Sequence, residues 1–442
     1  MKISKVSLSF ILSTALISST IFLASCSSAN AFYFANFESY MSPQLTTSIK
    51  ATDPNVNFRY FPTNEDLERT FVRNYDLAVS STYLMAKQAK DGLLQKLNWR
   101  DFNIETSPNV FITSATDALK LFTLPVQTAL TKVYDINGDG QFTDVDNLLQ
   151  YGVPYFLQDF ILGYKGAQVD AFNGTNVGWS DIMHYFSKKI GAGLPYNKIA
   201  LISDFRSIYS IPRIMQTQGI EANVNPPSNV KTTIAEFQQT YQYLTSLFSI
   251  NSFLLNSDSG VILNNFANPK GSDVGIMYNG DLLYAAQGGD DKFKFTANDV
   301  HYVRPKNTLI VLDMMVINNN SSQKKLAYDL IKKIALEGTS YNQDIKLSNP
   351  ENDEYIFGPM QNFDYVQYTS PLEKISNYVL SPTSSYFSDL YGPDLDPKLL
   401  TLYQNIFDVV QTPSDRNMFE SGLNDLEKSN MYQAFLREKG NF

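Results

Sequence analysis

One cysteine, Cys26, stands directly behind the first apolar stretch of the chain and is the only cysteine in its 442 residues. Two lysines near the start precede an uncharged, largely apolar run that reaches residue 23. A basic start, an apolar run and small residues before a cleavage point form the layout of a secretory signal. A cysteine directly behind the small residues is the position that bacterial lipoprotein processing acylates. The sequence therefore predicts a signal peptide over residues 1–25 and an acyl anchor on Cys26, which places the mature protein on the extracytoplasmic face of the cell membrane.

The alternative is a membrane-spanning helix followed by a cysteine without a role. The apolar run is about as long as a short spanning helix, but it is rich in Ser and Thr. A spanning helix also gives no reason for a cysteine at this point, so the lipoprotein signal is the favoured interpretation.

The composition excludes several classes of site. With Cys26 acylated, the mature chain has no thiol for a disulfide, a metal ion or nucleophilic catalysis. His184 and His301 are the only histidines, which argues against a His-rich metal site or a conventional catalytic triad. The net charge of −9 does not suit nucleic acid, whose binding needs clustered Lys and Arg. It suits a cationic ligand, although it can equally serve solubility.

Short apolar runs alternate with amphipathic segments along the rest of the chain. Strands are expected at 57–61, 77–79, 200–202 and 309–317, and helices over 234–248 and 326–334. Strands that alternate with helices indicate an α/β protein with a mainly parallel sheet. The length fits two such lobes.

The run from Tyr75 to Tyr83, in which a strand ends in a Ser-Ser-Thr-Tyr loop, resembles the spermidine/putrescine-binding proteins of bacterial ABC importers. Five further blocks resemble that family in the same order, up to about residue 345: 33–40, 151–155, 202–206, 274–280 and 309–317. The resemblance implies a two-lobed, type II periplasmic-binding-protein-like fold, in which crossover strands join two α/β lobes around a ligand cleft. The first lobe would comprise residues 31–158 and 309–360, and the second residues 159–308 and 361–442.

The same resemblance implies a set of ligand-binding side chains. A polyamine needs carboxylates for its ammonium groups and aromatic rings for its methylenes. The matched positions that supply such groups are Phe37, Tyr40, Ser81, Tyr83, Asp204, Tyr278 and Asp313. Ser39 and Ser207 stand where family members often carry glutamate, and we include both, with Glu38 beside Ser39, among the candidates. Asp159, in the expected crossover, is a further candidate.

Two of these acids could have partners within the protein. Asp204 could cap the helix that begins beside it, which is a common role for Asp. Asp313 interrupts an apolar run, where a buried carboxylate without a partner is costly. We expect Asp313 to meet a cation, which could be the ligand or an arginine.

A second motif lies at residues 135–146, which match an EF-hand-type calcium loop. Side-chain oxygens fall at loop positions 1, 3, 5, 9 and 12, the sharp-turn glycine falls at position 6, and a backbone carbonyl falls at position 7. The candidate ligands are Asp135, Asn137, Asp139, Gln141, Thr143 and Asp146. Asp in place of Glu at the twelfth position shortens that arm, and a helix is expected to follow the loop. The pattern predicts a structural Ca²⁺, and an Asp/Asn/Gly surface turn is the alternative.

The sequence thus predicts a membrane-tethered, monomeric solute-binding lipoprotein that captures putrescine or spermidine for an ABC permease. It predicts neither an enzyme nor a nucleic-acid partner. Within binding proteins, the alternative is another cation, such as thiamine or ferric ion. A surface lipoprotein that uses this fold for adhesion or hydrolysis is the alternative from a different class.

Overall fold

The structure is a computed structural model that describes residues 31–172, 177–191, 197–218, 233–286, 300–345, 355–381, 386–387, 397–409, 418–420 and 422–442. The predicted signal peptide and Cys26 lie outside the described residues. Residues Phe32–Phe442 form one unit by their contacts. Within the described ranges, no helix is both long enough and apolar enough to cross a bilayer.

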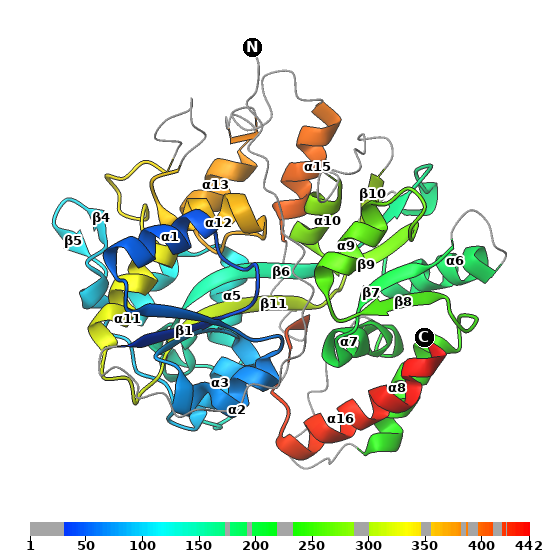
Figure 1. Ribbon diagram of the computed structural model, residues 1–442, viewed down its shortest axis with the longest axis horizontal. Coiled ribbons are helices and arrows are strands. Elements are labelled where there is room, and N and C mark those ends of the chain that lie inside the picture. Colours follow the sequence, from blue (N-terminus) through cyan, green and yellow to red (C-terminus); the bar gives the residue numbers. More distant parts are fainter. Residues whose placement is uncertain are drawn as a thin grey trace. The chain divides into compact units, whose positions relative to one another are not determined.

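Among the described residues, nine strands pair in one sheet, in the order β2-β1-β3-β11-β6-β9-β7-β8, with β10 joined to β6 (Figure 1). The strands of this sheet are β1 Phe32–Asn36, β2 Val56–Tyr60, β3 Leu77–Ser81, β6 Gly152–Lys165, β7 Ile199–Ile202, β8 Phe253–Asn256, β9 Val274–Tyr278, β10 Val300–Val303 and β11 Ile310–Ile317. A separate pair is formed by β4 Glu105–Ser107 and β5 Val110–Phe111. Strands β6 and β11 therefore link a first half of the sheet, β1–β3, with a second half, β7–β9.

Strand direction differs between the two halves and the linking strands. Neighbours within each half run parallel, whereas each antiparallel pair of this sheet includes β6 or β11. The predicted α/β class is confirmed, but the sheet is mixed and not mainly parallel. Strand β11 pairs antiparallel with β3 of the first half, β6 pairs antiparallel with β9 of the second half, and the two linking strands pair antiparallel with each other. Helical crossovers connect the parallel neighbours within each half.

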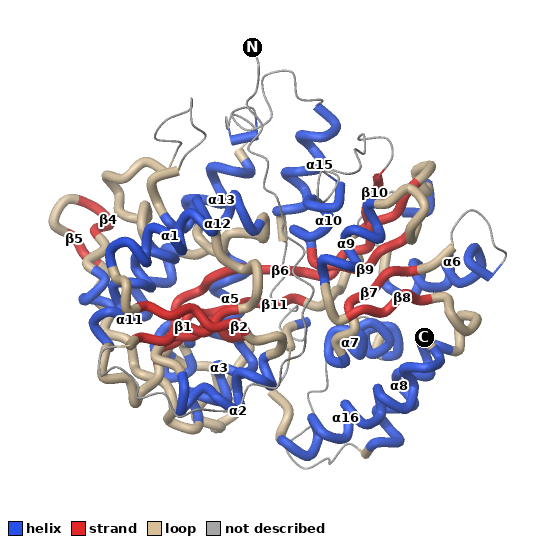
Figure 2. Tube along the Cα trace, viewed as in Figure 1, coloured by secondary structure: helices blue, strands red, loops and turns tan. Residues whose placement is uncertain are grey.

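Helices lie on both sides of the sheet strands (Figure 2). Their bounds are α1 Pro43–Thr52, α2 Asn64–Asn74, α3 Thr82–Lys90, α4 Ala115–Ala118, α5 Leu124–Lys132, α6 Trp179–Gly191, α7 Phe205–Gln216, α8 Ile234–Thr245, α9 Ser259–Ala267, α10 Asn279–Ala286, α11 Lys324–Ile331, α12 Gly358–Val366, α13 Glu373–Leu380, α15 Pro397–Phe407 and α16 Asp425–Glu438. In the C-terminal part, α12 packs against α1, α15 against α10, and α16 against α8. The end of the chain therefore contacts helices associated with both halves of the sheet.

The elements expected from sequence periodicity correspond to β2, β3, β7, β11, α8 and α11. Their ends differ by a few residues, since periodicity does not mark where hydrogen bonding stops. Helix α8 begins at a capping box in which Thr233 and Glu236 each accept a backbone N–H of the other. Helix α11 continues into a π-helical turn at Lys332–Leu336.

The two linking strands are buried along almost their whole length. Strand β11 is buried along its whole length, and β6 along all but its last residue. Three buried polar or charged side chains interrupt the apolar runs of these strands, namely Gln158 and Asp159 in β6 and Asp313 in β11. Each must find hydrogen-bond partners inside the protein, because an unpartnered polar group there is costly.

Candidate functional site

Asp313 lies at the centre of the candidate site because β11 runs between β3 and β6. In the strand register it stands opposite Ser81 of β3 and Phe156 of β6. Opposed residues of an antiparallel pair share a face with Cβ atoms about 5 Å apart. The Ser81 hydroxyl donates to Oδ1 of Asp313 at 2.7 Å, and Ser81 is itself held by Asn64 of α2.

The second carboxylate oxygen of Asp313 has two further donors. The Tyr40 hydroxyl donates to Oδ2 at 2.6 Å, and Nε2 of Gln158 donates at 3.0 Å. Burial raises the pKa of Asp313, and the bonds from Ser81, Tyr40 and Gln158 oppose that rise. All three donors are neutral, and within the described residues no Lys or Arg forms an ion pair with Asp313. The expected arginine partner is therefore not found, and the ligand remains the other candidate cation.

Aromatic rings pack around Tyr40, whose hydroxyl binds the Asp313 carboxylate. Its ring centre lies 5.4 Å from those of Tyr155 and Phe156 and 5.6 Å from those of Phe37 and Tyr368. These distances are typical of favourable edge-to-face contacts. The site thus combines a buried acid with apolar walls.

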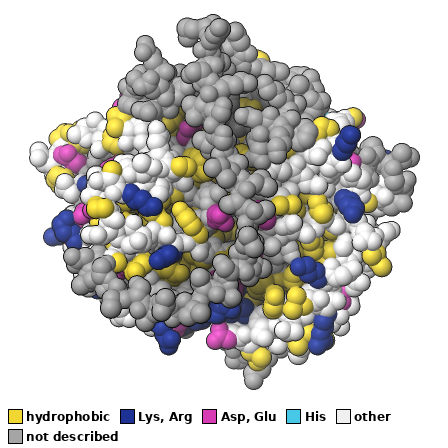
Figure 3. Space-filling model, viewed as in Figure 1, with side chains coloured by type: hydrophobic (Ala, Val, Ile, Leu, Met, Phe, Trp, Pro, Cys, Tyr) yellow, Lys and Arg dark blue, Asp and Glu magenta, His cyan; other side chains and the backbone are white. Residues whose placement is uncertain are grey.

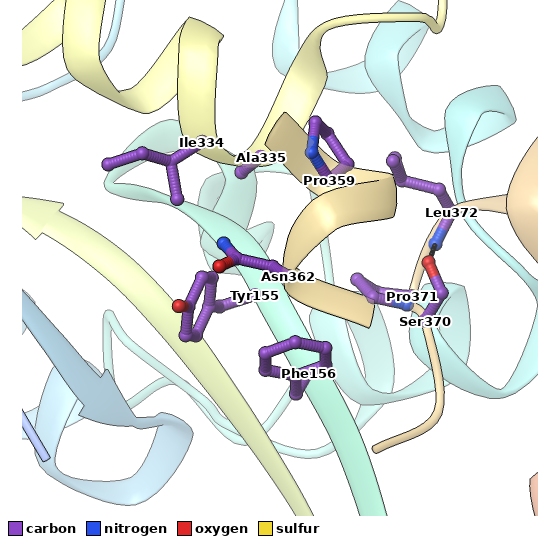
Figure 4. Close-up of a pocket in the computed structure, with 9 residues that line it drawn as sticks. All are labelled: Tyr155, Phe156, Ile334, Ala335, Pro359, Asn362, Ser370, Pro371 and Leu372. Carbon is purple, nitrogen blue, oxygen red and sulfur yellow. Dashed lines mark hydrogen bonds between the residues drawn. The ribbon is translucent and has the colours of Figure 1, made fainter. Parts of the chain in front are cut away.

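A β-bulge helps to place this set. The register between β11 and β6 shifts after Asp313, so that Met314 pairs with Pro154 and Tyr155 is the extra residue. The Tyr155 hydroxyl then donates to the Tyr40 carbonyl at 2.5 Å. Tyr155 and Phe156 also line a small pocket with residues from the π-helical turn Lys332–Leu336, from α12 and from the segment that follows α12 (Figure 4).

Tyr368 joins the two halves of the sheet. Its ring centre lies 6.3 Å from that of Tyr278, the last residue of β9, and its hydroxyl donates to Asp281 of α10 at 2.7 Å. Burial, opposed by this bond, raises the pKa of Asp281 to about 6. Sequence reasoning missed Tyr368, because the family resemblance ends near residue 345 and a lone Tyr after α12 carries no local signal.

A second cluster lies at the start of α7. Asp204 is the N-cap of this helix, and its carboxylate accepts the backbone N–H of Ser207 at 2.8 Å. The capping role considered from sequence is thus present. Two residues on, Nε of Arg206 donates to Oε1 of Glu65 in α2 at 3.0 Å. The Arg206 guanidinium also lies over the ring of Tyr83, 4.1 Å from its centre.

Glu420, in the C-terminal part of the chain, interacts electrostatically with this cluster. The segment is held by a parallel bridge between Phe419 and Ile310 and by a 2.7 Å bond from the Tyr134 hydroxyl to the Glu420 carbonyl. The Glu420 side chain is buried. Burial raises its pKa to about 8; Arg206 opposes this rise, and Asp204 adds to it. Nothing in the local sequence distinguishes this glutamate from other acids.

Tyr278 connects the two clusters. Its hydroxyl lies 3.4 Å from Oγ of Ser207. Burial raises the pKa of Tyr278, and the charges of Glu420, Asp204 and Asp313 raise it further. The carboxylates of both clusters therefore act on one aromatic side chain.

Three candidates from the sequence are placed apart from these clusters or are already paired. Glu38 and Ser39 lie on an exposed turn, where Ser39 has a φ of 56°. Asp159 forms an ion pair with Arg304, with Nε 2.6 Å from Oδ2. Arg304 also donates to the carbonyl groups of Asn405 and Ile406 at the end of α15, which indicates a structural role.

The loop at 135–146 closes on itself through side chain-to-backbone bonds. Asp135 accepts the N–H groups of Gly138 and Gly140. Asp146, at the twelfth position, accepts from the backbone of Ile136 and from both the backbone and the hydroxyl of Thr143. Across the described residues, this loop included, no three His, Cys, Asp or Glu side chains are placed to hold a metal ion.

The helix expected after this loop is absent. Two short 3-10 turns, Asp144–Asp146 and Leu148–Gln150, take its place. The Asn147 side chain caps the second turn, and β6 begins at Gly152. The chain therefore enters the sheet too soon for a helix to form.

Comparison with known proteins places this geometry in a family. A family model described as "Hypothetical lipoprotein (MG045 family)" matches residues 1–389. The chain belongs to this lipoprotein family. The lipoprotein is also 26% identical, over 311 residues, to the spermidine/putrescine-binding periplasmic protein of Escherichia coli, which covers 68% of this chain and 72% of that protein.

Solved structures of the same kind share its fold. The spermidine/putrescine substrate-binding protein PotD of Streptococcus pneumoniae, crystallised with calcium and HEPES, superposes with a TM-score of 0.54 at 17% identity, over 93% of this chain and 99% of that one. A spermidine/putrescine ABC transporter protein from Listeria monocytogenes superposes with a TM-score of 0.55 at 17% identity and the same coverage. The lipoprotein therefore has the two-lobed fold of solute-binding proteins.

Proposed function

We propose that this lipoprotein captures a polyamine, such as putrescine or spermidine, and delivers it to the permease of an ABC importer. The observation that carries this proposal is the buried Asp313 carboxylate, which lies on a linking strand among aromatic rings. An ammonium group would bind the carboxylate, and the methylenes would pack on the rings. The relatives are named for the same class of ligand.

A second group of acids supports a ligand with two charges, and an ammonium group there would favour release of the proton that Glu420 holds up to about pH 8. Asp204, Glu420 and Asp313 all contribute to the charge environment of Tyr278, whose hydroxyl lies 3.4 Å from Oγ of Ser207 at the start of α7. A diammonium ligand could thus meet acids from both clusters at once. The lobes would be residues 31–158 with 309–360 and residues 159–308 with 361–442, and closure of one on the other would bring these acids together.

We propose binding without catalysis. His184 is exposed and contacts the Ser180 carbonyl, and His301 contacts the Gly166 carbonyl. Neither histidine is among the described side chains that surround Asp313. On the face shown in Figure 3, the described Lys and Arg side chains are dispersed and do not form a patch for nucleic acid.

We also propose that an acyl group on Cys26 tethers a monomeric protein to the membrane. The family description as a lipoprotein and the sequence around Cys26 support this anchor. For the loop at 135–146 we propose a structural calcium ion, supported by the oxygen-bearing side chains at the expected spacing. The bonds that close the loop would have to rearrange in part, since they engage Asp146.

Calorimetric titration of putrescine, spermidine, thiamine and ferric ion tests the ligand class. Asp313→Asn should weaken polyamine binding about ten- to a hundredfold, the range of one charge-assisted contact. Asp329→Asn, an equal change in an exposed ion pair of α11, is the matched control. If the wild type binds no polyamine, or Asp313→Asn binds it as tightly, the proposal fails. Heat from thiamine or ferric ion alone would support another cation, and activity in a hydrolase panel would support a different class of protein.

A further inference from the structure

Arg206 lies over a ring that the sequence assigns to the ligand. Its guanidinium carbon is 4.1 Å from the centre of the Tyr83 ring, and its Nε donates to Oε1 of Glu65. The Tyr83 hydroxyl donates to the same oxygen at 3.2 Å. Only 3% of the Arg206 side chain is exposed, and a desolvated guanidinium stacks well on an aromatic face. The protein itself therefore supplies a cation to this ring and to one carboxylate.

The charge environment of Arg206 includes further acids. Burial acts to lower the pKa of Arg206, but Tyr83, Glu65, Glu420 and Asp204 outweigh it and raise the pKa above its usual value. The guanidinium thus stays charged. It offsets part of the negative charge that would otherwise act on a ligand beside Tyr278.

We propose that Arg206 is a specificity-determining residue, a resident cation that takes the place of one ligand ammonium group. With that place filled, the site prefers a diamine to a longer polyamine that carries an additional ammonium group. The inference rests on the proposed polyamine function and adds the number of charges that the site accepts. A ligand with one more ammonium group would meet Arg206 where it needs a carboxylate.

The test is the ratio of spermidine to putrescine affinity, measured by calorimetry at one ionic strength. Arg206→Gln should raise this ratio about tenfold, the scale of one charge-assisted contact. Arg206→Lys keeps the charge and should leave the ratio at the wild-type value. Arg304→Gln, which removes the buried arginine paired with Asp159, is the matched control and should also leave it unchanged. A merely structural role of Arg206 would lower both affinities without changing their ratio.

Glu65→Gln gives a second measurement that does not depend on the folding of Arg206→Gln. It removes the carboxylate paired with Arg206, so the uncompensated guanidinium should repel the more highly charged ligand and lower the ratio. A ratio unchanged in both Arg206→Gln and Glu65→Gln overturns the inference, while the proposed function stands if the wild type binds polyamines. A wild type that binds neither polyamine overturns the proposed function itself, and the inference with it.

Discussion

Nζ of Lys428 in α16 lies 2.5 Å from Oε2 of Glu68 in α2, so a helix near the C-terminus is tied to one near the start of the described chain. Glu65, one turn earlier in α2, accepts from Arg206 of α7. Helix α16 packs on α8, and α8 packs on α7. Helix α2 thus forms ion pairs with two cations, Lys428 and Arg206, which lie on helices associated with the second half of the sheet.

The Lys428–Glu68 pair should contribute measurably to stability. Both side chains are at most one-fifth exposed, so solvent screens them less than a surface pair. In a double-mutant cycle with Lys428→Met and Glu68→Gln, we expect a coupling of about 1 kcal/mol in urea unfolding, and it should decrease at high salt. The exposed pair Lys325–Asp329 in α11 is the control, and its coupling should be smaller because solvent screens it. Equal couplings for the two pairs would contradict this view.

Substitutions at Asp204 should separate its capping role from its charge. Asn is as good an N-cap as Asp, whereas Ala costs about 1 kcal/mol. Asp204→Asn should therefore unfold near the wild-type midpoint but bind polyamine more weakly, by less than Asp313→Asn does. Asp204→Ala should lower both the stability and the affinity for polyamine. If Asp204→Asn binds with wild-type affinity, Asp204 acts only as a cap.

Glu420 should make stability decrease as the pH rises. Its pKa is raised from 4.5 to about 8 in the fold, so the folded state holds a proton that the unfolded state releases. The resulting stabilisation is complete below about pH 4.5 and is lost as the pH rises to about 8, with a slope of at most about 1.4 kcal/mol per pH unit. The charged groups that act on it are Glu65 in α2, Asp204 and Arg206 in α7, and Asp313 in β11.

The measurement is urea unfolding at several pH values between 5 and 8 for the wild type and Glu420→Gln. The variant has no proton to lose at this position, so its stability should fall less steeply than that of the wild type. Other titrating groups, such as Asp281, contribute equally to both proteins and cancel in the comparison. Parallel curves would show that Glu420 does not hold this proton.

Calcium should raise the melting temperature, because a ligand that binds the folded state stabilises it by mass action. Asp135→Ala combined with Asp139→Ala should abolish the increment and leave polyamine binding unchanged. Magnesium at the same concentration is the control, since it demands a stricter octahedral geometry. If calcium does not change the melting temperature of the wild type, the loop is a turn closed by its own hydrogen bonds and the calcium proposal fails.

Cys26→Ser should release the protein from the membrane or leave its signal peptide uncleaved, because serine lacks the thiol that is acylated. Fractionation and gel migration of the two proteins in the native host provide the measurement. Cys26 is the only cysteine, so no second thiol can substitute. A variant that fractionates and migrates like the wild type would refute the anchor.

The sequence determined the local elements of this protein. Apolar runs predicted strands such as β3 and β11, which are buried on both faces. Amphipathic spacing predicted α8, because a helix that buries one face repeats its apolar residues with the helical period. The same reasoning anticipated that Asp204 could cap α7 and that Asp313, inside an apolar strand, would need partners. These properties depend on residues close together in sequence, and for that reason they could be predicted.

Only the tertiary structure decided which groups meet. Arg206 reaches Glu65, Tyr368 reaches Tyr40, and the partners of Asp313 prove to be two hydroxyls and an amide in place of an arginine. These contacts join segments far apart in the chain. A periodic pattern indicates that a side chain is buried, but it does not indicate which residues that side chain packs against. The charge balance around Arg206 follows from such contacts, so the folded arrangement sets it and no local motif does.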